Sequence, residues 1–212
     1  MGLTFLLGQV YHPDYDESSV SLKMRQTGGR CISFMNNLEK NSYVKTQILN
    51  ALLNMMKKMP FREITVSSLV QTAGVGRASF YRNYKSVEDV LLQEAKRVTE
   101  EWKREYDSVE HTQPNELLVS LLDFYKAYEE FFLSIYGAGQ QQIVLDTILA
   151  QIPILPEAEN AVAYVQSAFA YMIYGWIHEW MKRGMQESGT ELVKIFEEAQ
   201  KSGQTSPYAK MP

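Results

Sequence analysis

Between residues 77 and 85 the chain carries a group of side chains whose chemistry suits DNA. Arginine binds phosphate oxygens or the edge of guanine, and hydroxyl or amide groups bind phosphates or base edges. Phe80 and Tyr84 stand four residues apart, so on a helix both face inward and the other side chains face outward. A helix this short can enter a major groove at its N-terminal end. The predicted DNA contacts are Arg77, Ser79, Tyr81, Arg82, Asn83 and Lys85, with Thr65 and Ser67 from the preceding segment.

Two short helices joined by a glycine turn are predicted to position these side chains. Thr65 can cap the first helix through its hydroxyl, and Gly74 can end that helix. The second helix can begin after Gly76, which is a tolerated N-cap residue. The pattern predicts a helix-turn-helix, which is typical of DNA-binding proteins but also occurs in cores with no nucleic acid nearby.

The charge of this segment favours DNA binding. Residues 41–86 contain seven Lys or Arg and one acid, Glu63, which makes a net charge of +6. The whole chain has a net charge of −4, so the remaining residues together carry −10. A basic module on an acidic body is typical of phosphate binding, whereas an ordinary surface mixes both signs.

From about Ser42 to Leu92 the sequence resembles the N-terminal domain of the TetR family of bacterial transcriptional regulators. An amphipathic first helix, the run FREITVSSLVQTAGV and the run ASFYRNYKSVEDVL carry the resemblance. It implies a regulator that binds a palindromic operator as a homodimer, with repression that a small molecule relieves. The sequence departs from the family at Gly76, where Ser or Thr is usual, and at Val87, where a basic residue is frequent. Both departures leave more of the backbone anchoring to Arg77, Arg82 and Lys85.

No segment shows the alternation of a half-buried strand, so the predicted fold is all-α. We expect a first helix over 42–59, ended by Pro60, and a long helix over 87–107 with a solvated charged face. Further helices are expected over about 117–133, 143–152, 157–183 and 188–201, with an exposed His111 and a module break at 111–114. The predicted domains are an N-terminal extension (1–40), a helix-turn-helix domain (41–92), a connecting helix (93–110), a helical dimerisation and ligand-binding domain (111–203) and a tail (204–212).

Residues 1–40 show no sustained period, and we expect them to be mostly disordered. Two interpretations stay open. The codons of Gly28, Gly29 and Arg30 could be a ribosome-binding site read through as protein, with Met35 as the true start. Alternatively, the segment could be a basic arm that reaches into the minor groove through Lys23, Arg25 and Arg30.

The segment from about residue 157 to 183 is apolar on nearly every side, so its burial requires a cover on all sides. In a soluble chain of this length a second copy is the expected cover. The stretch GWIHEWMKRGM also resembles the C-terminal domain of a TetR subgroup of low-GC Gram-positive bacteria, in which the last two helices form a four-helix dimer bundle. The predicted dimer contacts are Phe169, Ile173, Trp176, Trp180, Leu192 and Phe196.

The C-terminal region is also rich in aromatic side chains, most of them expected to be ordinary core. Tyrosine hydroxyls need partners when buried, and together with a histidine they could provide polar points in an apolar cavity. The ligand would be a small apolar or aromatic molecule. The predicted ligand contacts are Phe124, Tyr125, Tyr128, Tyr171, Tyr174 and His178.

Several other function classes are not expected. His178–Glu179 and Glu129–Glu130 are adjacent pairs that do not face each other on a helix, and no phosphate-binding loop or metal-ligand spacing occurs, so we predict no enzyme, cofactor or metal. One cysteine excludes an intramolecular disulfide, and no segment is predicted to span a membrane, which fits a cytoplasmic protein. The alternative to a DNA-binding regulator is a helical module whose basic domain binds another protein. Repression and activation are not distinguished.

Overall fold

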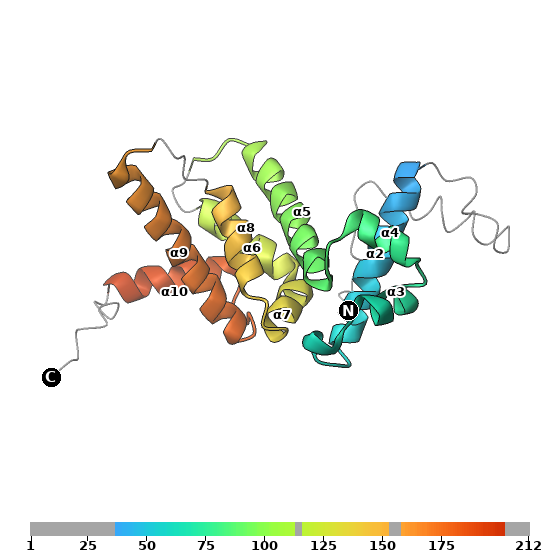
Figure 1. Cartoon of the computed structure of the whole chain (residues 1–212). Coiled ribbons are helices and arrows are strands. Elements are labelled where there is room, and N and C mark those ends of the chain that lie inside the picture. Colours follow the sequence, from blue (N-terminus) through green and yellow to red (C-terminus); the bar gives the residue numbers. More distant parts are fainter. Residues whose placement is uncertain (1–36, 113–115, 153–157, 202–212) are drawn as a thin grey trace, which may run out of the picture. The chain divides into compact units, whose positions relative to one another are not determined.

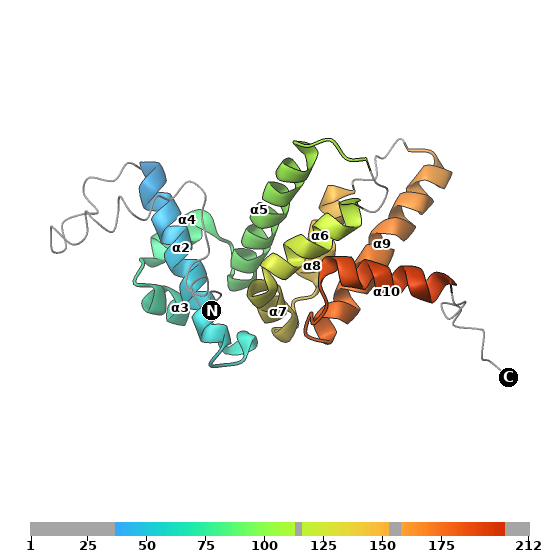
Figure 2. The ribbon, with the colours of Figure 1, turned by 180° about the vertical axis from the view of Figure 1, so that it is seen from behind.

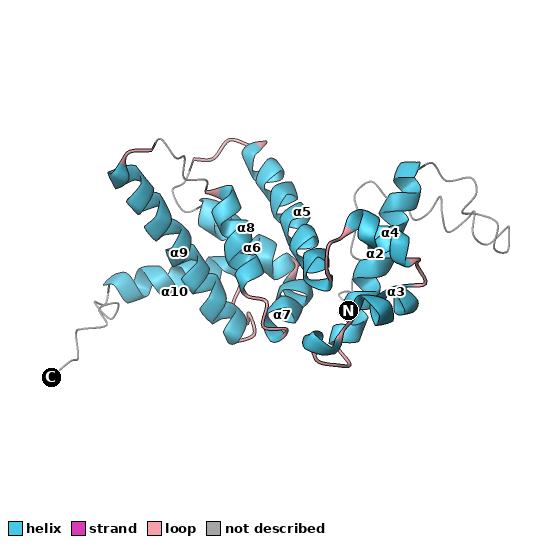
Figure 3. Ribbon diagram, viewed as in Figure 1, coloured by secondary structure: helices cyan, strands magenta, loops and turns pink. Residues whose placement is uncertain are grey.

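The computed structural model describes residues 37–112, 116–152 and 158–201, and every regular element within these ranges is a helix (Figures 1 and 3). The prediction of an all-α fold with an N-terminal helix-turn-helix is confirmed for this part of the chain. The chain forms two compact units, Met1–Val90 and Leu91–Pro212. The division falls inside a helix, whereas the predicted break at 111–114 lies between two helices of the second unit.

The first unit contains α2 (Asn37–Met56), the short 3-10 helix η2 (Phe61–Glu63), α3 (Val66–Ala73), α4 (Arg77–Asn83) and the first turn of α5 (Val87–Asp107). α2 packs against both α3 and α4, which also pack on each other (Figure 2). Leu52, Leu69 and Phe80 are completely buried, one from each of these three helices. This shared core holds the two short helices in place.

The first helix differs from its prediction at both ends. α2 begins at Asn37, five residues before the expected start at Ser42, because Leu38, Glu39 and Lys40 are all good helix formers. It ends at Met56, three residues early, and residues 57–59 form a turn before Pro60, which itself disfavours a helical backbone only at Met59. The prediction of disorder is therefore wrong for residues 37–40. Residues 1–36, which include the predicted minor-groove arm and the alternative start at Met35, lie outside the described residues, so the prediction of disorder is not tested there.

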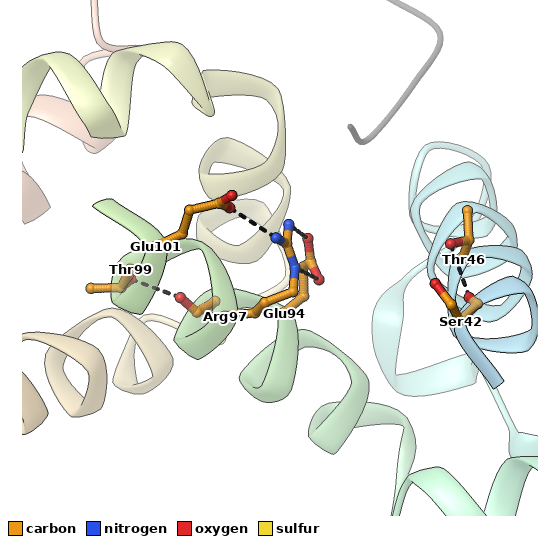
Figure 4. A network of polar contacts seen from close by, with 7 residues as sticks. Ser42, Thr46, Glu94, Arg97, Thr99 and Glu101 are labelled. Carbon is orange, nitrogen blue, oxygen red and sulfur yellow. Dashed lines mark hydrogen bonds and ion pairs between the residues drawn. The ribbon is translucent and has the colours of Figure 1, made fainter. Parts of the chain in front are cut away.

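α5 begins at Val87, as predicted. At its start Ser86 Oγ accepts from Asp89 N at 3.2 Å, and Asp89 Oδ2 accepts from Lys85 N at 2.8 Å. The charged face of α5 was expected to be exposed to solvent, but part of it is covered. Arg97 binds Glu94 at 2.7 Å and Glu101 at 2.9 Å, and the three side chains are only 25%, 13% and 20% exposed (Figure 4). The periodicity of the charges predicted these pairs, but did not show that neighbouring side chains cover them.

The second unit contains α6 (Glu116–Ala127), α7 (Glu129–Gly137), α8 (Gln142–Gln151), α9 (Asn160–Lys182) and α10 (Gly189–Lys201), together with most of α5. α10 packs on α6, and α9 packs on α7 and α8 (Figure 2). The helix expected over 117–133 is two helices that meet at Tyr128, where the backbone leaves the helical region. At this corner the rings of Tyr125 and Phe132 lie 4.5 Å apart.

His111 is not simply exposed, as predicted, but part-buried at the end of α5. Its ring stacks on Tyr106 with centroids 3.6 Å apart and an interplanar angle of 8°. Nδ1 lies 3.1 Å from Glu116 Oε2, and Nε2 lies 2.6 Å from the Tyr106 carbonyl oxygen. The side chain therefore connects the end of α5 to the first residue of α6. No helix in the described part of the chain is both long enough and apolar enough to cross a bilayer.

Candidate nucleic-acid interface

The first helix of the candidate interface is held at its start by a reciprocal cap. Thr65 Oγ1 accepts from Ser68 N at 3.1 Å, and Ser68 Oγ accepts from Thr65 N at 3.1 Å. Two backbone donors that would otherwise lack helical partners are thereby satisfied. Thr65 and Ser67 are both exposed, so the predicted contacts of α3 lie on its surface.

The turn between α3 and α4 requires glycine at position 74 but not at position 76. Gly74 ends α3 in the left-handed conformation, with φ of 66°, and donates to Gln71 O and Val70 O. A side chain at Gly74 would be strained there. Gly76 has an ordinary extended backbone, with φ of −75°, and a Cβ built on it meets nothing within 4 Å. The protein could therefore accept a capping serine at 76 without rearrangement.

α4 presents its charged side chains because two aromatic rings anchor its other face. Phe80 is completely buried and Tyr84 is 6% exposed, with ring centroids 5.7 Å apart. Arg77, Tyr81 and Arg82 are exposed, and the ring of Tyr81 meets that of Phe80 edge-on at 5.4 Å. The anchored rings orient α4, so its exposed face is preformed.

Ser79 and Asn83 are less available than the sequence predicted, because both are part-buried. Asn83 Nδ2 donates to the Ser79 carbonyl oxygen at 2.9 Å, so one of its amide protons is used inside the helix. Lys85 is exposed just beyond α4. Val87, where the resembling family often has a basic residue, is 6% exposed and belongs to the core. The strongest candidates are therefore Arg77, Tyr81, Arg82 and Lys85.

Within residues 65–85, three exposed residues other than glycine were not among the predicted contacts: Gln71, Thr72 and Ala78. Gln71 and Thr72 follow Ser67 and Ser68 by four positions, so helical spacing places them on the same side of α3. Thr72 Oγ1 donates to Ser68 O at 2.9 Å. Ala78 lies between two predicted contacts near the start of α4, and an alanine methyl can contact the methyl group of thymine.

The predicted dimer contacts divide into surface and core. Phe169 is 40% exposed, and Trp176, Leu192 and Phe196 are part-buried, with the rings of Trp176 and Phe196 3.8 Å apart. Ile173 and Trp180, by contrast, are 3% and 2% exposed within one chain. Their side chains already pack inside the protomer, so they do not offer surface to a second copy.

The predicted ligand contacts do not form one group. Phe124 and Tyr125 are buried core residues of α6, and burial raises the pKa of Tyr125 far above its ordinary value. The Thr147 hydroxyl beside Tyr125 donates its proton to Val144 O at 2.8 Å, so it does not donate to Tyr125 Oη, which has no hydrogen-bond partner. Tyr128 is part-buried near Arg97, and burial with the Glu101 carboxylate raises its pKa.

The other predicted ligand contacts lie on α9. The rings of Tyr174 and His178 are 5.6 Å apart, and that of Tyr136 in α7 lies 5.4 Å from His178. Burial raises the pKa of Tyr174, and His178 Nδ1 is buried without a hydrogen-bond partner. Tyr171 is 53% exposed and is separate from this ring cluster. In the described ranges no three His, Cys, Asp or Glu side chains are grouped as metal ligands would be.

No protein-family model matches the chain, and no functionally curated protein matches its sequence. Among solved structures, the crystal structure of Lin0861 from Listeria innocua is similar, with a TM-score of 0.64, 20% sequence identity, and coverage of 79% of this chain and 94% of Lin0861. This similarity shows a shared fold. The fatty acid degradation regulator FadR from Bacillus halodurans has a TM-score of 0.46 and 14% identity over 74% of this chain and 93% of FadR. That likeness is too distant to support an inference about function.

Proposed function

We propose that the protein is a sequence-specific DNA-binding regulator of transcription that has no enzymatic activity. The observation that carries the proposal is the exposed face of α4, where Arg77, Tyr81 and Arg82 project from a helix anchored by two buried rings. A rigid helix with outward arginines can place guanidinium groups against guanine, while phosphates accept from Tyr81 and Lys85. The net charge of +6 over residues 41–86 supports the same partner.

The regulator acts as a homodimer on a palindromic operator. Six of the nine large hydrophobic side chains exposed in the described residues lie in one segment of α9, between residues 162 and 172. Scattered exposed apolar residues are ordinary, but a contiguous group on one helix indicates an interface. A second copy covers this segment by two-fold symmetry. The residues are Val162, Tyr164, Val165, Phe169, Tyr171 and Met172.

In the dimer each copy presents α4 to one of two major grooves, with half-sites about 34–36 Å apart. Binding across a promoter represses transcription, and the protein acts in the cytoplasm of a bacterial cell. A small apolar or aromatic molecule releases it from DNA. The support for an effector is that Tyr125 Oη and His178 Nδ1 are among the four buried polar side-chain atoms of the described residues that lack a hydrogen-bond partner, the other two being Gln166 Oε1 and Trp180 Nε1.

A mobility-shift titration with the DNA that flanks the protein's own gene tests the proposal. The parent should give a discrete complex that unlabelled genomic DNA of random sequence displaces only at high excess. Arg77→Ala should lose the discrete complex, while Arg104→Ala, which removes an exposed arginine of α5 in the second unit, should retain it. Equal binding of the DNA by both variants would show that α4 is not part of the DNA interface. A parent that binds no flanking DNA but captures a protein would favour the protein-binding alternative.

A further inference from the structure

Two side chains of α6 hold the turn between α9 and α10. Asp123 Oδ1 accepts from the backbone N–H of Gly189 at 3.1 Å. Lys126 Nζ donates to the carbonyl oxygen of Met185. Asp123 and Lys126 are three residues apart, so they project from the same side of α6. Met185 lies inside the connection between α9 and α10, and Gly189, four residues later, is the first residue of α10.

The turn itself has an unusual backbone at its centre. Gly184 and Met185 are both left-handed, with φ of 79° and 50°, although only glycine adopts this region without strain. Met185 is nonetheless completely buried, and its N–H donates to Trp180 O at 2.9 Å. A strained residue persists where its surroundings over-determine it. Here the surroundings are the buried methionine side chain, the bond to Trp180 O and the Lys126 ammonium.

The start of α10 lies directly against α6. A Cβ built on Gly189 would stand 2.5 Å from Asp123 Oδ1 and 3.0 Å from both Asp123 N and Leu122 Cβ. Only glycine allows this approach without displacement of its neighbours. Lys126 also forms an ion pair with Glu129, whose Oε2 lies 2.8 Å from Lys126 Nζ. Both contacts therefore join groups whose positions are already constrained.

We propose that Asp123 and Lys126 form a two-point clamp that sets the positions of α9 and α10 relative to α6, and so shapes the surface that receives a second copy. The part about the second copy rests on the proposed dimer. One contact alone would leave the turn free to pivot about it, whereas two contacts at different residues of the turn fix its orientation. Loss of either contact leaves the helices folded but lets their relative positions vary.

Hydrogen exchange on the full chain tests the clamp locally. Lys126→Met keeps the aliphatic stem and removes the donor, and amides of residues 184–193 should then exchange about tenfold faster, in line with the loss of a charge-assisted hydrogen bond. Asp123→Ala should act similarly. Lys126→Arg keeps a donor and should restore slow exchange. Lys182→Met removes a neighbouring exposed lysine of α9 and should leave the turn unchanged. Exchange that stays slow in Lys126→Met, or accelerates uniformly across the second unit, would overturn the clamp.

Sedimentation equilibrium on the same variants tests the link to assembly. Lys126→Met should raise the dimer dissociation constant about tenfold, and Lys126→Arg should bring it back towards the parent value. Unchanged dimer affinity with faster local exchange would overturn the assembly part and retain the local clamp. A monomeric parent would contradict the proposed dimer, while the exchange measurement would still decide whether the two contacts hold the turn.

Discussion

Trp102 of α5 donates its indole N–H to the hydroxyl of Ser120 in α6 at 2.9 Å. The indole is 8% exposed and also stacks on Phe124, with ring centroids 5.7 Å apart. A buried indole needs a partner for its N–H, and this one is provided by a single hydroxyl. The contact fixes the packing of α6 on the long helix within the second unit.

Ser120→Ala should destabilise the protein by about 1–3 kcal/mol, because it leaves a buried donor without its acceptor. Urea unfolding followed by tryptophan fluorescence measures the change. Ser134→Ala is the matched control, since the Ser134 hydroxyl donates at 2.7 Å to Glu130 O of its own helix and leaves no donor without a partner when removed. Equal losses in the two variants would contradict a special role for the Trp102 contact.

Arg77→Ala and Lys85→Ala should weaken DNA binding in different ways. Arg77 is expected to read a base edge, so its loss should cost about 1–3 kcal/mol on the operator and relax preference at one base pair. Lys85 is expected to bind phosphate, so its loss should weaken binding to all sequences and reduce the salt dependence by about one unit. Fluorescence anisotropy on operator and random duplexes at several salt concentrations separates these effects. Identical specificity changes in the two variants would refute the assignment.

Phe169→Glu and Ile173→Glu should also differ, because only Phe169 is at the surface. Phe169→Glu should fold normally but dissociate the dimer, since an unpaired charge in an apolar interface costs several kcal/mol. Ile173→Glu places the charge in the protomer core and should reduce helicity and thermal stability. Light scattering and circular dichroism measure the two outcomes, with Ala150→Glu on the exposed side of α8 as a control. A parent that is monomeric at micromolar concentration would exclude the dimer.

The stability of α10 should depend on acid pH through Glu191. Its carboxylate accepts from Ser188 N at 2.9 Å and from the Ser188 hydroxyl at 2.8 Å, which hold its pKa below the ordinary value of 4.5. A pKa lowered by folding means that the carboxylate stabilises the folded state above the unfolded pKa, and that this stabilisation is lost as pH falls through the folded pKa.

Glu191→Gln should therefore have a lower thermal midpoint than the parent at pH 7, and the two midpoints should converge as the pH falls below the ordinary carboxylate pKa of 4.5 and through the lower pKa of the folded state. Thermal unfolding followed by circular dichroism across this range provides the comparison. Glu197→Gln changes an exposed carboxylate of the same helix and serves as the control. A constant difference between parent and Glu191→Gln at all pH values would contradict a contribution from the ionised carboxylate.

Helices and turns that depend on residues close together in the sequence were predictable. Thr65, Gly74 and the inward pair Phe80 and Tyr84 act within a few residues of their own position, and the helix-turn-helix follows from them. The break between α6 and α7 left no glycine or proline signal, so the apolar stripe was interpreted as one helix. The burial of Ile173 and Trp180 within one chain was also not predictable. When a helix is apolar on every side, its sequence does not show which side packs against its own chain and which side faces outward.

Contacts between distant residues were not predictable at all. Asp123 meets Gly189, and Lys126 meets Met185, across separations of 66 and 59 residues. No pattern within a helix marks such partners. The part-buried state of Asn83 was missed for a different reason, because its bond to Ser79 O is local but its amide could equally have faced solvent. The candidate DNA-binding surface is consequently smaller than predicted at these positions, and it gains Gln71, Thr72 and Ala78.

If the protein dimerises through the apolar segment of α9, as proposed, the amount of protein in the cell becomes part of its control. If only paired chains bind the operator, occupancy at low expression rises with the square of chain number, so halving synthesis lowers it about fourfold. Tyr164 and Val165 are 72% and 70% exposed in the single chain, so in the proposed dimer a newly made chain would show them to chaperones and proteases until it pairs. On this proposal scarce chains would be removed faster than abundant ones, which would sharpen the threshold between a silent and an active promoter.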